Sequence, residues 1–221
     1  HPDTAIELMN LGAIYEQLER WFDAEPLKRR ALDIARSVHG GTFASIAPTA
    51  SLGWLYLRMG RIERGQTLLE DAHFISSQYD RQSLEQPWNL LRLSSAHFLA
   101  RRPNLSIFFG KLGINGLQRL RVGLSDSQAI SQQSFIRSNQ DTYEHLVSLL
   151  LTQGRIGEAM QVSTMLKEQE LFGMIEGDPA VGFDPRSTLV AYTSTERPFV
   201  DRLDALAARL MPIRTELDRL E

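Results

Sequence analysis

Residues 141–171, DTYEHLVSLLLTQGRIGEAMQVSTMLKEQEL, decide the fold that this sequence predicts. Apolar side chains recur at helical spacing on both sides of Gly154, and a glycine adopts the left-handed conformation that ends a helix at little steric cost. The apolar sets are Leu146, Leu149 and Leu150 before the glycine, and Ala159, Val162 and Leu166 after it. The stretch therefore predicts two helices joined by a tight turn at 153–155. Because one hairpin cannot bury both of its faces, we expect neighbours of the same kind.

Small residues recur along the chain in pairs 12 positions apart, and each pair fits one such hairpin. The pairs are Gly12 with Ala24, Gly53 with Gly65, Ser94 with Ser106, and, with a larger first member, Val147 with Ala159. Small side chains let the two helices of a hairpin approach closely, while leucine and aromatic positions fill the space to the next hairpin. The third unit is the least regular, because Ser94, His97 and Gly113 occupy its framework positions.

This pattern resembles the tetratricopeptide repeat (TPR), and its first two units look like the longer kinesin-light-chain type. The resemblance implies an all-α fold, a right-handed superhelical solenoid of about four helical hairpins with the third degenerate. One departure lies in the first unit, where Lys28 stands at a position that the family usually fills with a large apolar or aromatic side chain.

The chain divides into three predicted parts. We expect the repeat domain at 1–172, a linker rich in Gly, Pro and Asp at 173–194, and a C-terminal helix at 195–221. One stripe of that helix is apolar, and it consists of Leu203, Leu206, Leu210, Ile213, Leu217 and Leu220. Three local features are also predicted: a capping box at 125–128 that begins a helix running to 152, a short strand at 187–192, and a kink or split of the last helix near Arg209 caused by Pro212.

A second resemblance covers residues 105–172. This segment is similar to the region that precedes the CHAT domain, a caspase-like peptidase module fused to tetratricopeptide repeats in bacteria. The matching positions are Phe108–Lys111 with Asn115, Gln118 and Arg121; Phe135, Ser138 and Tyr143; and Gly154, Arg155, Glu158, Ala159, Leu166, Lys167 and Glu170. The resemblance implies a longer parent protein with a His–Cys peptidase. That dyad cannot lie in this chain, which contains no cysteine.

Composition limits the classes of partner. The net charge of −3 gives no electrostatic reason to expect binding to nucleic acid or to an acidic membrane surface. No apolar run approaches the roughly 18 residues that a membrane span needs. The lack of cysteine fits a reducing cytoplasm, so we expect a cytoplasmic protein or piece of one.

Residues that carry chemistry do not form a recognisable constellation. The five histidines show no HExxH motif or close pairing, and His97 falls at a packing position. The glycines at 110, 113 and 116 suggest a phosphate loop, but GxxxxGK[ST] is absent and close helix packing explains them better. We therefore predict no catalytic residue, no cofactor and no metal site.

The predicted functional surface is the concave groove, which the first helix of each hairpin lines in a repeat of this kind. Its candidate residues are Asn10, Ala13, Gln17, Ser51, Trp54, Arg58, Trp88 and Arg92. An amide such as Asn10 both donates and accepts, so it can clamp a peptide backbone. Trp and Arg are enriched at interface anchors, although both tryptophans also fit packing against a neighbouring hairpin.

The sequence thus predicts a non-catalytic scaffold. It would bind a peptide or partner protein in the groove and, by the second resemblance, control an attached caspase-like peptidase. Two alternatives remain: an oligomerisation module that uses the apolar stripe of the C-terminal helix, and a helical enzyme with an unrecognised site.

Overall fold

The computed structural model describes residues 2–39, 43–79, 85–122, 129–174 and 189–217, and within these ranges every regular element is a helix. The elements are α1 (Pro2–Gln17), α2 (Trp21–His39), the short 3-10 helix η1 (Phe43–Ser45), α3 (Ile46–Arg58), α4 (Ile62–Tyr79), α5 (Glu85–Leu99), α6 (Pro103–Val122), α7 (Ala129–Thr152), α8 (Ile156–Met174) and α9 (Arg197–Leu217). None of these helices has the combination of length and hydropathy needed to cross a bilayer.

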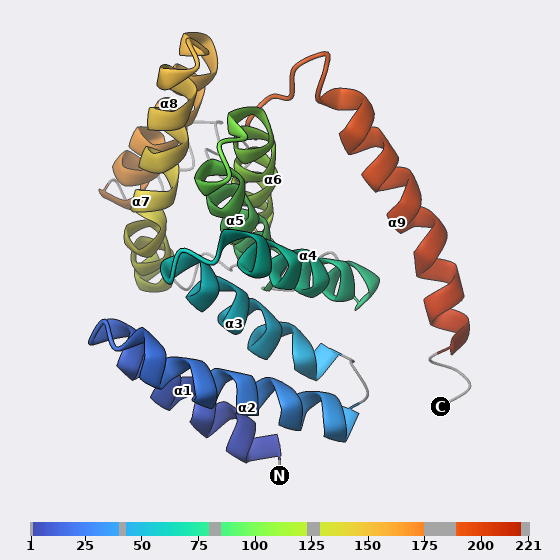
Figure 1. The fold of residues 1–221 in the computed structure, drawn as a ribbon. Coiled ribbons are helices and arrows are strands. Elements are labelled where there is room, and N and C mark those ends of the chain that lie inside the picture. The colour runs from blue at the N-terminus through green and yellow to red at the C-terminus, as the bar shows by residue number, and fades with distance from the viewer. Residues whose placement is uncertain (1, 40–42, 80–84, 123–128, 175–188, 218–221) are drawn as a thin grey trace.

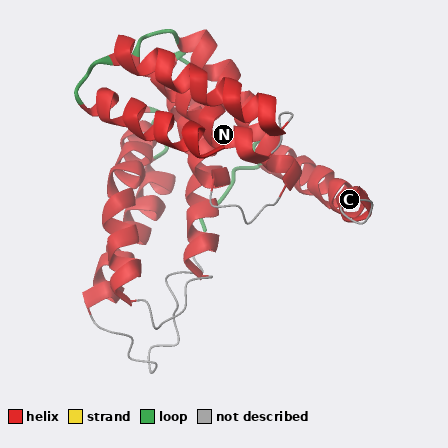
Figure 2. Cartoon of the chain, turned by 90° about the horizontal axis from the view of Figure 1, so that it is seen from below, coloured by secondary structure: helices red, strands yellow, loops and turns green. Residues whose placement is uncertain are grey.

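The first eight helices form four antiparallel hairpins, and this confirms the predicted all-α repeat architecture. α1 packs on α2, α3 on α4, α5 on α6 and α7 on α8, while consecutive hairpins stack through α2–α3, α4–α5 and α6–α7 (Figure 1). α9 contacts α4 and, through Phe199, whose ring centre lies 6.2 Å from that of Phe108, also α6; it lies at the side of the hairpins, as the view from below also shows (Figure 2).

The small-residue pairs lie where the helices of a hairpin come closest. A Cβ atom added to Gly65 would lie 2.8 Å from the carbonyl oxygen of Gly53, so the second hairpin has no room for a methyl group there. In the third hairpin, the hydroxyls of Ser94 and Ser106 each donate to the carbonyl oxygen of the other residue, at 2.7 and 2.8 Å. The third unit therefore forms a regular hairpin despite its irregular sequence.

All four hairpin turns have the same conformation. Glu19, Gly60, Arg101 and Gly154 have φ values of 56°, 74°, 58° and 68°. In each turn the N–H of the following residue donates to a carbonyl five positions earlier, for example from Arg155 to Leu150 at 2.9 Å and from Arg20 to Tyr15 at 2.8 Å. Only two of the four turns use glycine, so a search for glycine finds only half of them.

Lys28 fills its framework position with its aliphatic stem. A Cβ atom on Gly12 would lie 2.9 Å from Cγ of Lys28, and the ammonium group donates to Glu16 at 2.5 Å and to Ser51 at 2.8 Å. Burial lowers the pKa of Lys28, although the hydrogen bond to Glu16 opposes that effect. The stem thus does the packing of a large apolar residue while the charge is paired.

Three local predictions are corrected or lie outside the described residues. The prediction of a strand at 187–192 is wrong for its described part, because residues 189–193 are extended but belong to no sheet. The expected split of the helix at Pro212 is wrong, since α9 runs as one element from Arg197 to Leu217, and the kink stays a prediction. The capping box at 125–128 lies outside the described residues.

Candidate peptide-binding surfaces

The predicted groove residues lie on α1, α3 and α5, which are neighbours in the stack. Asn10, Ala13, Gln17 and Arg58 are exposed, and Ser51, Trp54, Trp88 and Arg92 are half-buried. α1 thus contributes the most accessible polar groups, and α3 and α5 contribute partly covered aromatic side chains. The use of this surface for binding stays a prediction.

Several of these side chains already have contacts inside the protein. The hydroxyl of Ser51 accepts from Lys28, and the guanidinium of Arg58 lies 4.9 Å from the centre of the Trp21 ring. Trp54 packs against the apolar cluster of the second hairpin, which contains Ile46. Trp54 is therefore packed on one side and accessible on the other, and its contact with a ligand stays a prediction.

A second surface, which we call the α6–α8 cleft, holds an extended segment of the chain itself. Side-chain amides on the two helices bind the backbone of 189–191. Asn115 Oδ1 accepts from the Val190 N–H at 2.7 Å, and Asn115 Nδ2 donates to the Val190 carbonyl at 3.0 Å. Gln161 donates to the Leu189 carbonyl at 3.1 Å and accepts from the Ala191 N–H at 3.2 Å. These bonds recognise backbone groups and so are indifferent to side-chain identity.

One side chain of the segment is buried. Val190 is 1% exposed and lies in the core cluster that includes Ile114, Leu150 and Val162, whereas Leu189 and Ala191 are exposed. The alternation follows from extended backbone, in which successive side chains point to opposite sides. The α6–α8 cleft therefore reads one aliphatic side chain and the backbone on both sides of it.

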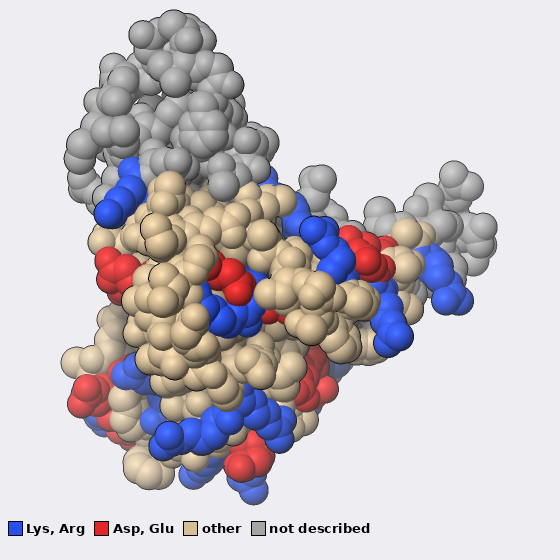
Figure 3. Space-filling view, turned by 90° about the horizontal axis from the view of Figure 1, so that it is seen from above, with Lys and Arg blue, Asp and Glu red and all other residues tan. Residues whose placement is uncertain are grey.

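A cluster of four charged side chains closes this cleft. Lys111, which is 0% exposed, pairs with Glu158 and Glu196 and donates to the Ala191 carbonyl at 2.9 Å. Arg155 donates to Glu158 at 2.6 Å and to Glu196 at 2.8 Å. Figure 3 shows acidic and basic atoms side by side, bordered by uncharged atoms, in the middle of the face seen from above.

The ion pairs determine the protonation of the two carboxyls. Burial alone would raise the pKa of Glu158 and of Glu196, but the hydrogen bonds from Lys111 and Arg155 outweigh burial and hold each pKa below its ordinary value. Glu196 also accepts from the Thr193 N–H at 2.9 Å, immediately before α9 begins. The cluster thus fastens the start of α9 to α6 and α8.

Sequence reasoning missed the α6–α8 cleft as a site. Lys111, Asn115, Arg155 and Glu158 entered only as motif positions of a family resemblance, and 189–193 was expected to be linker. The signal available in the sequence was a polar face on a helix that should be packed, since Lys111 and Asn115 lie one turn apart on α6.

The described residues hold no group of three or more His, Cys, Asp or Glu side chains arranged to bind a metal ion. His97 is buried and stacks on Phe109 with 5.0 Å between ring centres, as expected for a packing position.

The fold and these surfaces define an all-α, TPR-like protein of helical hairpins. Residues 3–73 match the tetratricopeptide repeat family model. Two crystal structures of TPR-like repeats from Podosopora anserina, assigned as a kinesin light chain with nearly identical repeats, are similar to this chain. The first is 14% identical with a TM-score of 0.49, covering 82% of this chain and 98% of that one. A single-substitution variant is 16% identical with a TM-score of 0.50, covering 99% and 98%. Comparison with curated proteins found no match.

The match to the family model identifies a TPR region, and the second structure supports the fold over nearly the whole chain. At such low identity the structural likeness says nothing of partners. Tetratricopeptide repeats in general are protein-interaction scaffolds and are typically non-catalytic.

Proposed function

We propose that this chain is a protein-interaction scaffold that binds extended peptide segments of partner proteins in the groove lined by α1, α3 and α5. The observation that carries the proposal is the α6–α8 cleft, where the same hairpin framework holds an extended segment by amide clamps and one buried aliphatic side chain. The cleft lies on second helices and the groove on first helices, so the cleft supports the proposal as an example of extended backbone bound by amides of this hairpin framework, and not through shared residues.

The groove offers complementary chemistry. Asn10 and Gln17 are exposed amides about two helical turns apart on α1, so they lie on one face of the helix. They are suited to the N–H and C=O groups of an extended backbone. Trp54, Trp88 and Arg92 supply half-buried side chains of the types that anchor interfaces. The expected ligand is thus a peptide that lays its backbone on α1 and an apolar or aromatic side chain against α3 and α5.

The test is to select binders from a random peptide library on the intact chain and to measure their affinity for variants by fluorescence anisotropy. Asn10→Ala removes an exposed amide and Trp54→Ala removes the aromatic anchor; each is expected to weaken binding about tenfold or more, as for interface anchors. Phe74→Ala, which removes a 65% exposed aromatic residue from α4, is the matched control and should bind normally. If Asn10→Ala and Trp54→Ala bind the selected peptides as tightly as Phe74→Ala and the wild-type chain do, the peptides do not bind in this groove.

Control of an attached caspase-like peptidase is a further part of the proposal, and it rests on the resemblance of residues 105–172 alone. Ligand binding in the groove would change the stacking of the hairpins, and the last hairpin would pass that change to a following module. In a parent protein with peptidase activity, Trp54→Ala and Arg92→Ala should abolish activation by the partner while leaving basal cleavage intact. Activation that survives both changes argues against this control.

Oligomerisation through α9 is the second candidate. Leu203 and Leu206 are 41% and 52% exposed, and Phe199 near the start of α9 is 58% exposed. Sedimentation of the intact chain and of a Leu203→Lys, Leu206→Lys variant decides it. A dimer that becomes a monomer in the variant supports the candidate, and a wild-type monomer rejects it.

A further inference from the structure

We propose that the cleft between α2, α3 and α4, called here the α2–α4 cleft, is a second peptide-binding site built on the same plan as the α6–α8 cleft. Its ligand would be an extended segment of a partner protein with one aliphatic side chain, of the size of Val190, as the anchor. This site differs from the groove on α1, α3 and α5, so the inference does not rest on the function proposed above.

The repeat frame makes the two clefts equivalent. In the α6–α8 cleft, Lys111 and Asn115 lie five and nine residues after the small residue Ser106. In α2, Arg29 and Asp33 lie five and nine residues after the small residue Ala24. The two walls therefore carry a cation and an oxygen acceptor at the same positions along their helices.

The opposite wall repeats in the same way. Gln161 and Val162 lie two and three residues after Ala159 on α8. Thr67 and Leu68 lie two and three residues after Gly65 on α4. Leu68 is thus the apolar counterpart of Val162, and Thr67 is a partial counterpart of Gln161, because its hydroxyl donates to the Glu63 carbonyl at 3.0 Å and offers a peptide only an acceptor.

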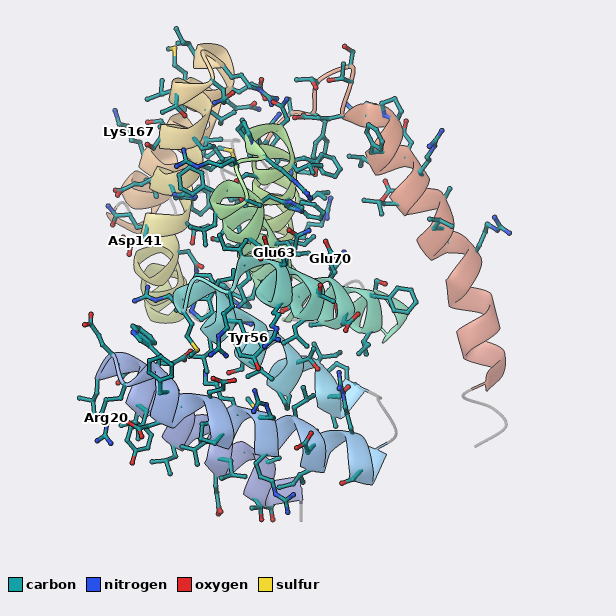
Figure 4. The ribbon with its side chains drawn as sticks, viewed as in Figure 1. Arg20, Tyr56, Glu63, Glu70, Asp141 and Lys167 are labelled. Carbon is teal, nitrogen blue, oxygen red and sulfur yellow. The ribbon has the colours of Figure 1, made fainter. Side chains whose placement is uncertain are left out.

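The α2–α4 cleft is open and has the shape for such a ligand. Its volume is about 520 Å³, and ten residues line it. The floor is apolar, with Leu32, Leu52 and Tyr56 buried and Leu68 half-buried, and Tyr56 lies between α2 and α3 in Figure 4. The rim is polar and exposed, and it consists of Arg29, Asp33, Arg36, Glu63, Arg64 and Thr67. The equivalent floor residues of the other cleft, Ile114, Leu146, Leu150 and Val162, belong to the cluster that buries Val190.

Internal contacts hold this site in place before any ligand arrives. Arg61 donates to both carboxylate oxygens of Glu25 at 2.9 Å, and Arg29 pairs with the same carboxylate and donates to the Tyr56 hydroxyl at 2.8 Å. In the α6–α8 cleft the equivalent cations, Lys111 and Arg155, bind two carboxylates, Glu158 of α8 and Glu196 at the end of the docked segment. In the α2–α4 cleft both equivalent cations are paired with Glu25, so the anchor and the backbone of the ligand, and not an acidic residue, are expected to supply its contacts.

The remaining rim groups suit a peptide backbone. Asp33 has the acceptor of Asn115 but not its donor, so it can bind only the N–H of the anchor residue. Arg36, one turn further along α2, is the donor for the carbonyl. It has no ion-pair partner among the described residues, and the same holds for Arg64 across the cleft.

The site faces away from the groove on α1, α3 and α5. Leu52 and Tyr56 each lie two residues from Trp54 on α3, which places them about 200° around the helix axis from it. A ligand in the α2–α4 cleft therefore leaves the groove free.

The test uses the intact chain and a fluorescein-labelled peptide with the sequence of residues 187–196, STLVAYTSTE, whose binding is followed by fluorescence anisotropy. Thr67→Trp fills the α2–α4 cleft from its exposed rim without touching the core, and it should weaken binding at least tenfold. Arg30→Trp adds the same bulk on an exposed position of α2 outside the cleft and should bind as the wild type does. A peptide in which Asp replaces the valine should not bind, because its anchor would be charged.

Three results would overturn the proposal. The first is that the peptide does not bind the wild-type chain at 1 mM, and the second is that it binds Thr67→Trp as tightly as the wild type. The third is that Asn115→Ala loses binding while Thr67→Trp keeps it. The last result would mean that the peptide exchanges with residues 189–193 in the α6–α8 cleft. Trp54→Ala should bind this peptide normally, so a failure here is distinguishable from a failure of the groove.

Discussion

Replacing Asn115 by alanine should detach residues 189–193 from the α6–α8 cleft while the four hairpins stay folded. Asn115 accepts from the N–H of Val190 at 2.7 Å and donates to its C=O at 3.0 Å, and Val190 is 1% exposed. A buried backbone group without a partner costs about 1–3 kcal/mol, so keeping the segment docked would cost about 2–6 kcal/mol. Detaching it forfeits the burial of the Val190 side chain, about 1.5–3 kcal/mol, together with the bonds from Lys111 and Gln161. The mutant adopts whichever state costs less, docked without its partner or detached, and in either case the docked segment loses at least about 2 kcal/mol of stability.

Amide hydrogen exchange at native conditions measures this loss. A change of about 2 kcal/mol corresponds to roughly 30-fold faster exchange at Val190 and Ala191 under conditions in which the segment opens and closes faster than an open amide exchanges. The amides of α1–α4 should keep their protection, because the segment does not contact those hairpins through Asn115. Asn10→Ala is the matched control, since it removes the same side chain from an exposed position and should change stability by less than about 0.5 kcal/mol. Unchanged protection of Val190 in Asn115→Ala would refute the clamp.

Three further predictions concern packing and charge. Gly65→Ala should lower the unfolding free energy by up to about 2 kcal/mol, the overpacking cost of about 1–3 kcal/mol less about 1 kcal/mol for the better helix propensity of alanine. Gly157→Ala, with nothing within 4 Å of its added methyl group, should raise it by up to about 1 kcal/mol, and urea unfolding followed by circular dichroism checks the opposite signs. Because the folded pKa of Glu158 and of Glu196 lies below the ordinary value of 4.5, their contribution to stability is complete above that pH and lost as pH falls through the folded values. The protection factors at 189–196, which correct for the slower intrinsic exchange at low pH, should therefore fall below about pH 4.5, and pH-independent protection factors would contradict the ion-pair cluster. Lys111→Met leaves Glu158 and Glu196 without their buried cation and should destabilise the docked segment by about 3–5 kcal/mol, measured by the same exchange experiment at pH 7. Unchanged protection would show that the ion pairs of Lys111 do not stabilise docking.

The hairpin frame was predictable because its determinants are local and periodic. Gly53 and Gly65 stand 12 residues apart on antiparallel helices that one short turn joins, so the sequence spacing fixes which backbones meet. Gly60 and Gly154 mark two of the turns by their tolerance of positive φ, and Glu19 and Arg101 adopt the same conformation without that mark.

The candidate sites were predictable only in part. The sequence placed Asn10, Trp54 and Arg58 on the first helices of their hairpins, where the structure finds them. It left open whether Trp54 packs or stays accessible, because that depends on how far the next hairpin covers its ring. Ser51 was a groove candidate, yet its hydroxyl is bound by Lys28 from the second helix of the first hairpin.

The sequence by itself determined that this chain forms all-α helical hairpins of the TPR type, since helix spacing and small-residue intervals act over distances of a dozen residues. Only the tertiary structure decided that residues 189–193 lie in a cleft, because the bonds from Asn115 to Val190 join positions 75 apart in the chain. An extended segment has no periodic signature of its own; its conformation and its partners come from the surface that binds it. The equivalence of the α2–α4 cleft to that surface also depends on the tertiary structure. The repeat frame shows which residues correspond, but only the α6–α8 cleft with residues 189–191 in it shows which of them contact a bound segment.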